Sequence, residues 1–307
     1  MYRKLLPFLL VFGCIGWIQR ASAQQDADKR PLRRIIIDPG HGGSAKEAGA
    51  FYGASGKIME EKDVALAVGL KLRDLINKEI PDVEVIMTRT TDVFDHPVVK
   101  ANKANAAKGD LFISLHCNDM PPLRHREVIG YTTKKVKRKG KTVTRKIPEY
   151  RTWYTPYPAK GTETYIWGVA KTKDKEEALL ENNYVDTTQL VIPKEETNPA
   201  IRMMNSFRTQ EYARRSRILA ETVEDEFAKA GRVDRGAKQR DEKGIWVLQA
   251  VAMPAILVEM GFLSDPDDEQ ILTTSDGQES IAACIVKALR RYKYALEQQV
   301  SGVGKGK

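Results

Sequence analysis

The stretch IIIDPGHGG, Ile35 to Gly43, joins a run of isoleucines to a turn that holds a histidine among glycines. Consecutive β-branched residues predict a buried strand, and Asp-Pro-Gly is typical of the turn that ends one. A histidine after such a turn is commonly an ordinary turn or core residue. It can also face a ligand, because open α/β sheets bind ligands just outside the carboxyl ends of their strands.

Strand patterns alternate with helical patterns over much of the chain, which favours an α/β fold with a single domain over residues 24–300. Further strands are expected at 83–89, 110–118, 161–168 and 254–261, and helices at 61–80, 97–109, 201–229 and 279–296. The stretches 120–160 and 169–205 interrupt this alternation, and we interpret them as insertions. Residues 301–307 are expected to form a flexible tail.

The first 23 residues have the layout of a secretory signal peptide: a basic start, an apolar run and an Ala-Ser-Ala cleavage site. The apolar run, Leu5 to Trp17, is too short for a permanent membrane span. A lipid-modified Cys14 is the alternative, which Phe12 disfavours. We therefore expect an exported protein, periplasmic or associated with the cell wall, with no transmembrane segment after signal removal.

The net charge of +9 is concentrated in one segment, KKVKRKGKTVTRK, from Lys134 to Lys146, which contains eight basic residues and no acidic one. Without this segment and the signal, the remaining chain is slightly acidic. A hairpin with Gly140 at its turn is expected here. The segment suits an anionic surface, with a solvated loop as the alternative; its lack of interleaved aromatic residues argues against nucleic acid.

Two histidines stand at the ends of predicted strands: His41 follows IIIDPG, and His116 closes FISLH. Glu61 opens the first predicted helix after a glycine-rich loop, which would place its carboxylate near both imidazoles. Its alternative role is to complement the helix dipole. Two histidines and a glutamate form the ligand set of a catalytic zinc with a fourth position for water. His96 and His125 are expected on the surface.

Glu259 closes an apolar strand, ILVE, where a carboxylate is costly unless it has partners. It could belong to a structural ion pair. Beside zinc it could instead act as a general base that takes the proton of the attacking water. Cys117 and Cys284 are expected to be packed thiols rather than a disulfide.

Five stretches in this order closely resemble the zinc-dependent N-acetylmuramoyl-L-alanine amidases, a family of cell-wall hydrolases: IIIDPGHGG, MEEKDVAL, MTRTTD, KANKANAAKGDLFISLHCN and ILVEMGFLSD. The resemblance covers about residues 32–118 and 206–295. It implies an α/β fold with a mostly parallel sheet of about six strands flanked by helices. It also implies hydrolysis of the amide between N-acetylmuramic acid and L-alanine in peptidoglycan, in cell separation or wall turnover.

The same resemblance implies one zinc ion held by His41, Glu61 (not Glu60) and His116, with Glu259 as the catalytic base. Two departures are visible: Lys100 stands where the family usually has arginine, and Cys117 where a small residue is usual. Because side chains alternate along a strand, Cys117 should point away from His116, and it is not expected to be a ligand.

The second insertion resembles the lid of self-inhibited family members, in which a glutamate occupies the open zinc position until a partner protein withdraws it. Glu181 is the best match in KEEALLENNYV, and Glu177 is second. An ordinary charged helix face is the alternative. Two other functions remain open: a zinc peptidase or deacetylase acting on another amide, and a wall-binding protein without catalysis, which has no need of a base beside a metal.

Overall fold

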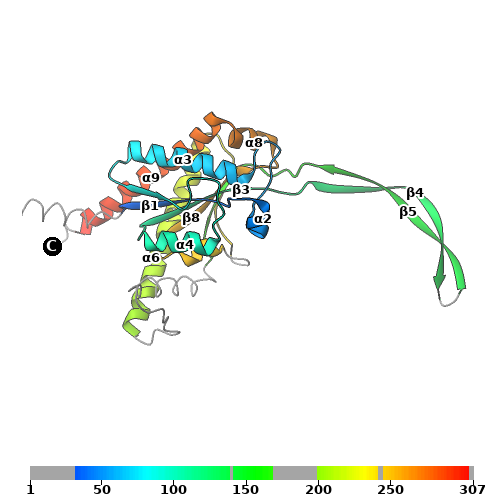
Figure 1. Cartoon of the computed structure of the whole chain (residues 1–307), viewed down its shortest axis with the longest axis horizontal. Coiled ribbons are helices and arrows are strands. Elements are labelled where there is room, and N and C mark those ends of the chain that lie inside the picture. The colour runs from blue at the N-terminus through cyan, green and yellow to red at the C-terminus, as the bar shows by residue number, and fades with distance from the viewer. Residues whose placement is uncertain (1–31, 139–140, 169–198, 241–244, 304–307) are drawn as a thin grey trace, which may run out of the picture.

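The computed structural model describes residues 32–138, 141–168, 199–240 and 245–303. They form one α/β domain around a six-stranded sheet with the order β2-β1-β3-β8-β6-β7 (Figure 1). Its strands are β1 (Arg34–Pro39), β2 (Glu84–Met87), β3 (Leu111–Asn118), β6 (Thr162–Ile166), β7 (Asp234–Gln239) and β8 (Ala255–Phe262). The strands β2, β1, β3 and β8 are parallel, β6 is antiparallel to β8, and β7 is parallel to β6. The predicted mostly parallel sheet is confirmed.

The isoleucines of β1 lie at the centre of the core, since Ile35 and Ile37 are fully buried. Strand β3 is the neighbour of β1, with Asp38 opposite Ser114 in the register, and β8 follows with Glu259 opposite His116. Because these strands are parallel, their carboxyl ends meet at one edge of the sheet. The residues that follow IIIDP and FISL are thereby brought to the same place.

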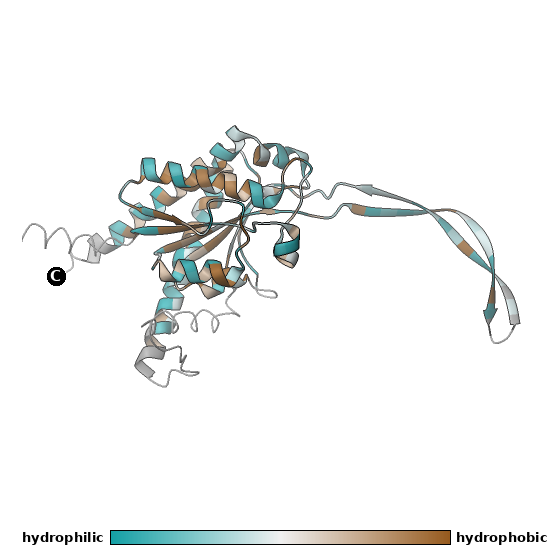
Figure 2. Ribbon diagram, in the orientation of Figure 1, coloured by the Kyte–Doolittle hydropathy of each residue, from teal (hydrophilic) through white to brown (hydrophobic). Residues whose placement is uncertain are grey.

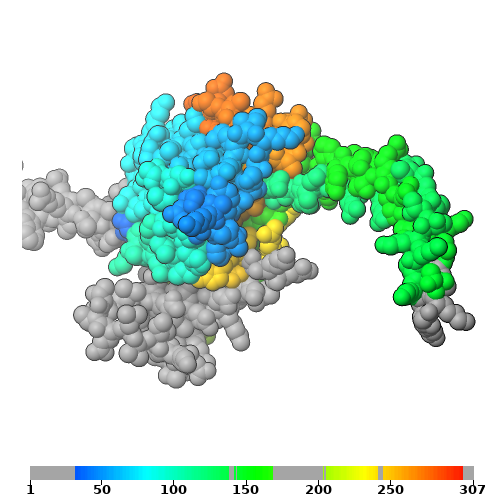
Figure 3. Space-filling model, turned by 45° about the vertical axis from the view of Figure 1, so that its right-hand side comes forward, coloured from blue at the N-terminus to red at the C-terminus, as the bar shows by residue number. Residues whose placement is uncertain are grey.

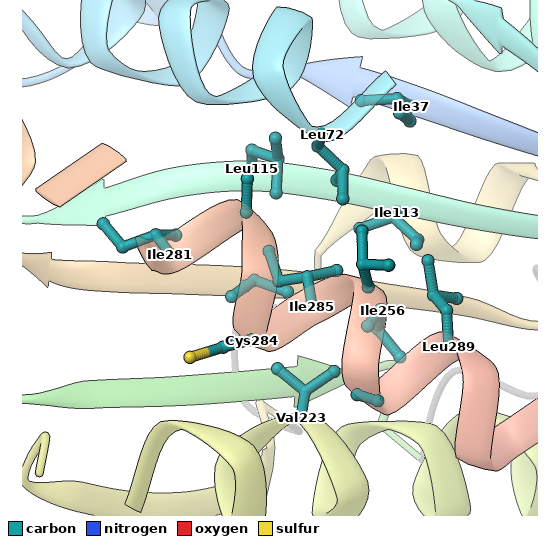
Figure 4. Close-up of a cluster of buried hydrophobic side chains, with 14 of the residues drawn as sticks. Ile37, Leu72, Ile113, Leu115, Val223, Ile256, Ile281, Cys284, Ile285 and Leu289 are labelled. Carbon is teal, nitrogen blue, oxygen red and sulfur yellow. The ribbon is translucent and has the colours of Figure 1, made fainter. Parts of the chain in front are cut away.

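Helices cover both faces of the sheet. On one face, α3 (Glu61–Glu79) and α9 (Ser275–Val303) pack with the C-terminal half of α6 (Pro199–Lys229), through residues such as Leu72, Val223 and Ile285 (Figure 4). On the other face lie α4 (Pro97–Ala106) and α7 (Trp246–Ala250). Figure 2 shows the apolar residues gathered where these layers meet.

Short elements connect the layers. The helix α2 (Ala45–Ala48) and the 3-10 turn η1 (Gly49–Phe51) lie between β1 and α3, and α8 (Pro266–Thr273) precedes α9. A capping box fixes the start of α2: the Glu47 amide donates to Ser44 Oγ at 3.4 Å, and the Ser44 amide donates to Glu47 Oε2 at 3.0 Å. The loop that leads from β1 to α3 is therefore a structured segment.

The first insertion is an extended two-stranded ribbon, formed by β4 (Leu123–Arg138) and β5 (Lys141–Thr155). It stands away from the body of the domain (Figures 1 and 3). The expected hairpin is confirmed and is longer than the basic segment alone, because pairing runs from Leu123 opposite Thr155 to Arg138 opposite Lys141. Gly140 lies outside the described residues.

Besides the short helices α2, α7 and α8, which were not expected, two larger elements differ from the prediction. Strand β7 was not expected, because DRGAKQ lacks the apolar alternation of a half-buried strand; it lies at the edge of the sheet, where polar residues are tolerated. Helix α9 is longer than expected, from Ser275 to Val303 rather than 279–296, so residues 301–303 of the expected flexible tail are helical; residues 304–307 lie outside the described ranges. Cys117 and Cys284 are buried free thiols, as predicted.

Several predictions concern residues outside the described ranges: the signal peptide, the Cys14 alternative, and most of the second insertion with Glu177 and Glu181. Within the ranges that are described, no helix has both the length and the apolarity that crossing a bilayer requires.

A candidate metal centre

Three predicted ligands converge at the carboxyl end of the sheet. His41 follows β1, His116 lies near the end of β3, and Glu61 is the first residue of α3. Glu61 Oε1 lies 3.0 Å from His41 Nε2 and 2.9 Å from His116 Nδ1. One ligand atom from each residue lies within 4.8 Å of the other two, and among the described residues this is the one group of the kind that could hold a metal ion.

The backbone around His41 is shaped to bring its ring to Glu61. His41 has a φ of 55°, in the left-handed region that few non-glycine residues adopt. Two glycines leave room for the rings: a Cβ on Gly40 would lie 2.5 Å from His116 Cε1, and one on Gly53 would lie 2.8 Å from Glu61 Oε2. The glycine-rich sequence therefore permits a close approach of backbone and ligands.

The hydrogen bond of His41 Nδ1 determines whether the Nε2 atom that faces Glu61 carries a hydrogen in the neutral ring. His41 Nδ1 lies 2.6 Å from the carbonyl oxygen of Phe51, and because a carbonyl only accepts, Nδ1 carries the hydrogen. A neutral His41 then presents the lone pair of Nε2 to a carboxylate oxygen. Two acceptors 3.0 Å apart need a proton or a metal cation between them. The donor set therefore fits a cation.

Glu61 is buried and held on both oxygens. Oε1 also accepts from the Cys117 amide at 3.1 Å, and Oε2 accepts from the Ala54 amide at 2.8 Å. Burial opposes ionisation, but the hydrogen bonds from His116 and His41 hold the pKa of Glu61 well below its usual range. Glu61 is therefore a carboxylate, the form that binds metal.

The two imidazoles differ in their surroundings. Burial lowers the pKa of His116, which favours the neutral ring that a metal ligand requires. Burial also acts to lower the pKa of His41, but its hydrogen bond to Glu61 outweighs this and leaves that pKa raised.

Glu259 lies on β8 between two site strands, opposite His116 of β3 and Glu163 of β6. Burial first, and then the negative charges of Glu61 and Glu163, raise the pKa of Glu259 well above its usual value. Its Oε2 atom is buried and has no hydrogen-bond partner among the described residues. A buried carboxyl group with an unused oxygen beside a cation site is suited to holding and releasing a proton.

Glu163 is a site residue that the sequence did not indicate. It accepts hydrogen bonds from Asn118 Nδ2 at 2.9 Å, Tyr165 Oη at 2.8 Å, Arg235 Nε at 2.9 Å and the Lys238 ammonium group. Burial opposes ionisation, but these donors, with Lys238 and Arg235 strongest, lower the pKa of Glu163 to about 2. A permanent negative charge therefore faces Glu259.

Asp38 was expected only to end a strand, but the structure gives it a second role. It is almost fully buried, accepts from Thr88 Oγ1 at 2.6 Å and from Ser114 Oγ at 2.8 Å, and pairs with Lys100 Nζ at 3.0 Å. Lys100 Nζ also donates to the carbonyl oxygen of Pro39 at 2.7 Å. The lysine therefore anchors the end of β1, immediately before His41.

A cavity of about 200 Å³ adjoins the candidate metal centre and reaches His41, His116 and Lys100. Its remaining wall is mainly apolar, with Phe51, Phe94, Ile245, Trp246, Val247 and Leu257. Trp246 is 48% exposed despite its size. An apolar wall beside a few convergent polar groups is the usual character of a small-molecule site.

The remaining predicted residues lie apart from the three converging ligands. His96 is exposed, as expected, and caps α4, because its Nδ1 accepts from the Val98 amide at 3.3 Å. His125 lies on the ribbon and stacks on Trp153. Cys117 is buried in the core, where burial raises the pKa of its thiol well above the usual value.

Comparisons with known proteins agree on one family. A sequence profile described as N-acetylmuramoyl-L-alanine amidase matches residues 35–291. The chain is 29% identical over 259 residues to N-acetylmuramoyl-L-alanine amidase AmiC of Escherichia coli O6:H1, a match that covers 84% of this chain and 52% of that protein. The chain thus spans about half the length of such curated relatives.

Solved structures share the fold. N-acetylmuramoyl-L-alanine amidase AmiC2 of Nostoc punctiforme superposes with a TM-score of 0.52 at 20% identity, covering 85% of this chain and 97% of that one. The CwlD amidase of Clostridioides difficile, solved in complex with the GerS lipoprotein, gives 0.50 at 22% identity, with coverages of 86% and 99%.

Proposed function

The chain belongs to the N-acetylmuramoyl-L-alanine amidase family, and from this membership and the geometry of the site we propose that it is a zinc-dependent peptidoglycan amidase. Its substrate would be the amide that joins the lactyl group of N-acetylmuramic acid to L-alanine of the stem peptide. The observation that supports this best is the convergence of His41, Glu61 and His116 around one carboxylate oxygen.

His41, Glu61 and His116 would hold one zinc ion. Their nitrogen and oxygen donors are those that catalytic zinc prefers when a fourth position is left for water or substrate. A zinc ion bound there supplies Lewis acidity, which polarises the scissile carbonyl and lowers the pKa of a water molecule. The Phe51 carbonyl would keep the hydrogen of His41 on Nδ1, away from the metal.

Glu259 would move the proton during hydrolysis. It would accept the proton of the attacking water and hand it to the leaving amine, which needs a carboxyl group whose affinity for a proton is raised. Its buried setting beside Glu61 and the ionised Glu163 supplies that affinity. The apolar wall around Trp246 would exclude water and carry part of the substrate.

Mass spectrometry of muropeptides after digestion of purified peptidoglycan tests the proposed reaction. An amidase releases stem peptides with free L-alanine amino termini. New D-amino acid termini would instead indicate a peptidase, and loss of acetyl groups a deacetylase. Intact wall after incubation with the zinc-loaded protein that lacks residues 171–200 of the second insertion would favour a binding protein without catalysis.

We also propose that the protein is exported to the periplasm or cell wall, through a signal in residues 1–23, and takes part in cell separation or wall turnover. A partner protein could regulate it through the second insertion, with Glu181 or Glu177 over the metal; the CwlD amidase complex with GerS supports a protein partner by analogy. Deletion of residues 171–200 should raise wall hydrolysis. No rise would count against the lid.

A further inference from the structure

The β4–β5 ribbon leaves the domain at the same edge of the sheet as the candidate metal centre. It is inserted between β3, which ends just after His116, and β6, which begins just before Glu163. Since β6 is antiparallel to β8 while β3 is parallel to it, the start of β6 and the end of β3 lie together. The hydrogen bond from Asn118 to Glu163 joins the two roots.

The ribbon is long compared with the site. Strand β4 has 16 residues, and at about 3.3 Å per residue it reaches roughly 50 Å. Anything bound along it would therefore extend from the catalytic edge well beyond the cavity that holds the scissile bond.

The two faces of the ribbon both carry cations and aromatic rings, but the strand register places the acidic residues on one face only. One face, called here the tyrosine face, has the following described residues: Arg124, Arg126, Val128, Tyr131, Thr133, Lys135, Lys137, Thr142, Thr144, Lys146, Pro148, Tyr150, Thr152 and Tyr154. None of these described residues is acidic. The opposite face carries both acidic residues of the strands, Glu127 and Glu149, and Glu127 pairs there with Arg151 at 2.8 Å.

The tyrosine face combines open aromatic rings with cations. Tyr131 is 67% exposed and Tyr154 is 61% exposed. The guanidinium of Arg126 lies over the Tyr150 ring, 3.1 Å from its centroid, so these two side chains form a stacked cation–π pair. Beyond these residues, Lys135, Lys137 and Lys146 extend the positive charge toward the tip. No ion pair of the described residues neutralises these lysines.

We propose that the tyrosine face binds a strand of peptidoglycan outside the cleavage site. The aromatic rings would pack on sugar rings, and the lysines and arginines would bind carboxylates of the stem peptides. The proposal rests on the proposed function, because the edge from which the ribbon emerges is the one where the same polymer would be cut. It names a second binding surface for that polymer, remote from the metal centre.

Two other occupants fit the observations less well. A membrane surface calls for apolar side chains near the tip, but the outermost described side chains of this face include Lys137 and Thr142, and the tyrosines lie toward the root. A second copy of the chain would bring like charges together along the strand edges, which opposes pairing. An anionic polymer with ring surfaces satisfies both the charge and the aromatic residues.

A matched pair of double variants tests the proposal, made with Glu259→Gln so that the wall is not digested during the measurement. Lys135→Gln with Lys146→Gln removes two charges from the tyrosine face, and Lys134→Gln with Arg145→Gln removes two from the adjacent rung on the opposite face. Sedimentation with purified peptidoglycan sacculi gives the dissociation constants. We expect about a tenfold loss for the first pair and at most about a twofold loss for the second.

The aromatic part needs its own variant. Tyr131→Ala with Tyr154→Ala keeps the charge and should weaken binding to sacculi about tenfold. Because the substituted ribbon side chains are all exposed, each variant should fold, and circular dichroism checks this. Equal losses on both faces would show a mere net-charge effect and overturn the proposal, as would unchanged binding in the tyrosine variant.

Two further measurements separate the possible ligands. A protein without substitutions on the tyrosine face should bind sacculi with amidated carboxylates about tenfold more weakly than ordinary sacculi. Equal affinity for both would refute carboxylate recognition. If the Lys135 and Lys146 substitutions weakened binding to phosphatidylglycerol vesicles as much as to sacculi, a lipid surface would replace the wall as the ligand. Hydrolysis of a soluble muramyl peptide by the native chain tests the proposed function separately. Face-dependent binding without that hydrolysis, both in the native chain and after deletion of residues 171–200, would retain this surface and refute the amidase.

Discussion

The candidate metal centre and the β4–β5 ribbon start from the same edge of the sheet, yet they are built in opposite ways. Two ligands of the centre are held by backbone groups of other segments: His41 by the carbonyl of Phe51, and Glu61 by the amides of Ala54 and Cys117, above a buried layer of isoleucines. The ribbon residues contact mainly their cross-strand neighbours, and most are exposed. A substitution at the centre should therefore affect chemistry or folding, and one on the ribbon should affect only binding.

The largest effect is expected at the ligands. His41→Ala should abolish zinc binding and hydrolysis together, because two of the three protein ligands do not make a catalytic zinc site. Metal analysis of the dialysed protein, combined with an assay on purified peptidoglycan, checks both. Retention of one stoichiometric zinc by the folded variant would remove His41 from the ligand set.

The next effect concerns stability at the centre. Lys100→Met leaves Asp38 buried without its cation, which should lower the free energy of unfolding by about 3–5 kcal/mol. Lys100→Arg keeps the charge and should cost much less. Urea denaturation of both variants measures the difference. Similar unfolding midpoints for the two would show that the ion pair with Asp38 is not what anchors β1.

A pH effect is expected at Glu224 of α6, which is hydrogen-bonded to β6. Burial raises the pKa of Glu224 from 4.5 to about 7, although Thr164 and Thr162 donate hydrogen bonds to it. The folded state thus holds the proton more tightly than the unfolded state. The resulting stability is fully present below pH 4.5 and is lost as the pH rises through about 7.

The expected loss from this one group is up to about 3 kcal/mol. Glu224→Gln should remove this part of the pH dependence, measured as unfolding free energies from pH 5 to pH 8. An unchanged pH profile in the variant would show that Glu224 titrates alike in both states.

The smallest effect is expected on the ribbon. Glu127→Gln breaks an ion pair with Arg151 whose two side chains are both more than half exposed. Such pairs contribute about 0–1 kcal/mol, so thermal unfolding of the domain should hardly change. A large drop in melting temperature would mean that the ribbon is coupled to the core, contrary to the contrast drawn above.

The sequence predicted the regions whose pattern is local. The isoleucines of β1 and the run FISLH marked buried strands, and the histidines at their ends marked the crevice. Glu61 was assigned to the site because it begins a predicted helix. Glu259 was assigned because a buried carboxylate at the end of an apolar strand is energetically costly. These four residues lie where those patterns put them, three of them converging on one point.

Residues that depend on distant partners could not be predicted in this way. The stretch TETYI does not reveal the hydrogen bonds that Glu163 accepts from Asn118 and Arg235, because those partners lie on other strands. Strand β7 is polar because it forms the edge of the sheet, so it lacks the apolar period that identifies a strand. The two faces of the ribbon also emerge only from its register, which includes a bulge between Val128 and Gly130.

The most direct test of the central claim compares muropeptides released from purified peptidoglycan by the zinc-loaded native chain and by its Glu259→Gln variant. The account predicts stem peptides with free L-alanine amino termini from the native chain, and a rate at least about 100-fold lower from the variant, which should still bind zinc. Full activity in the variant, or products cut at any other bond, would contradict it.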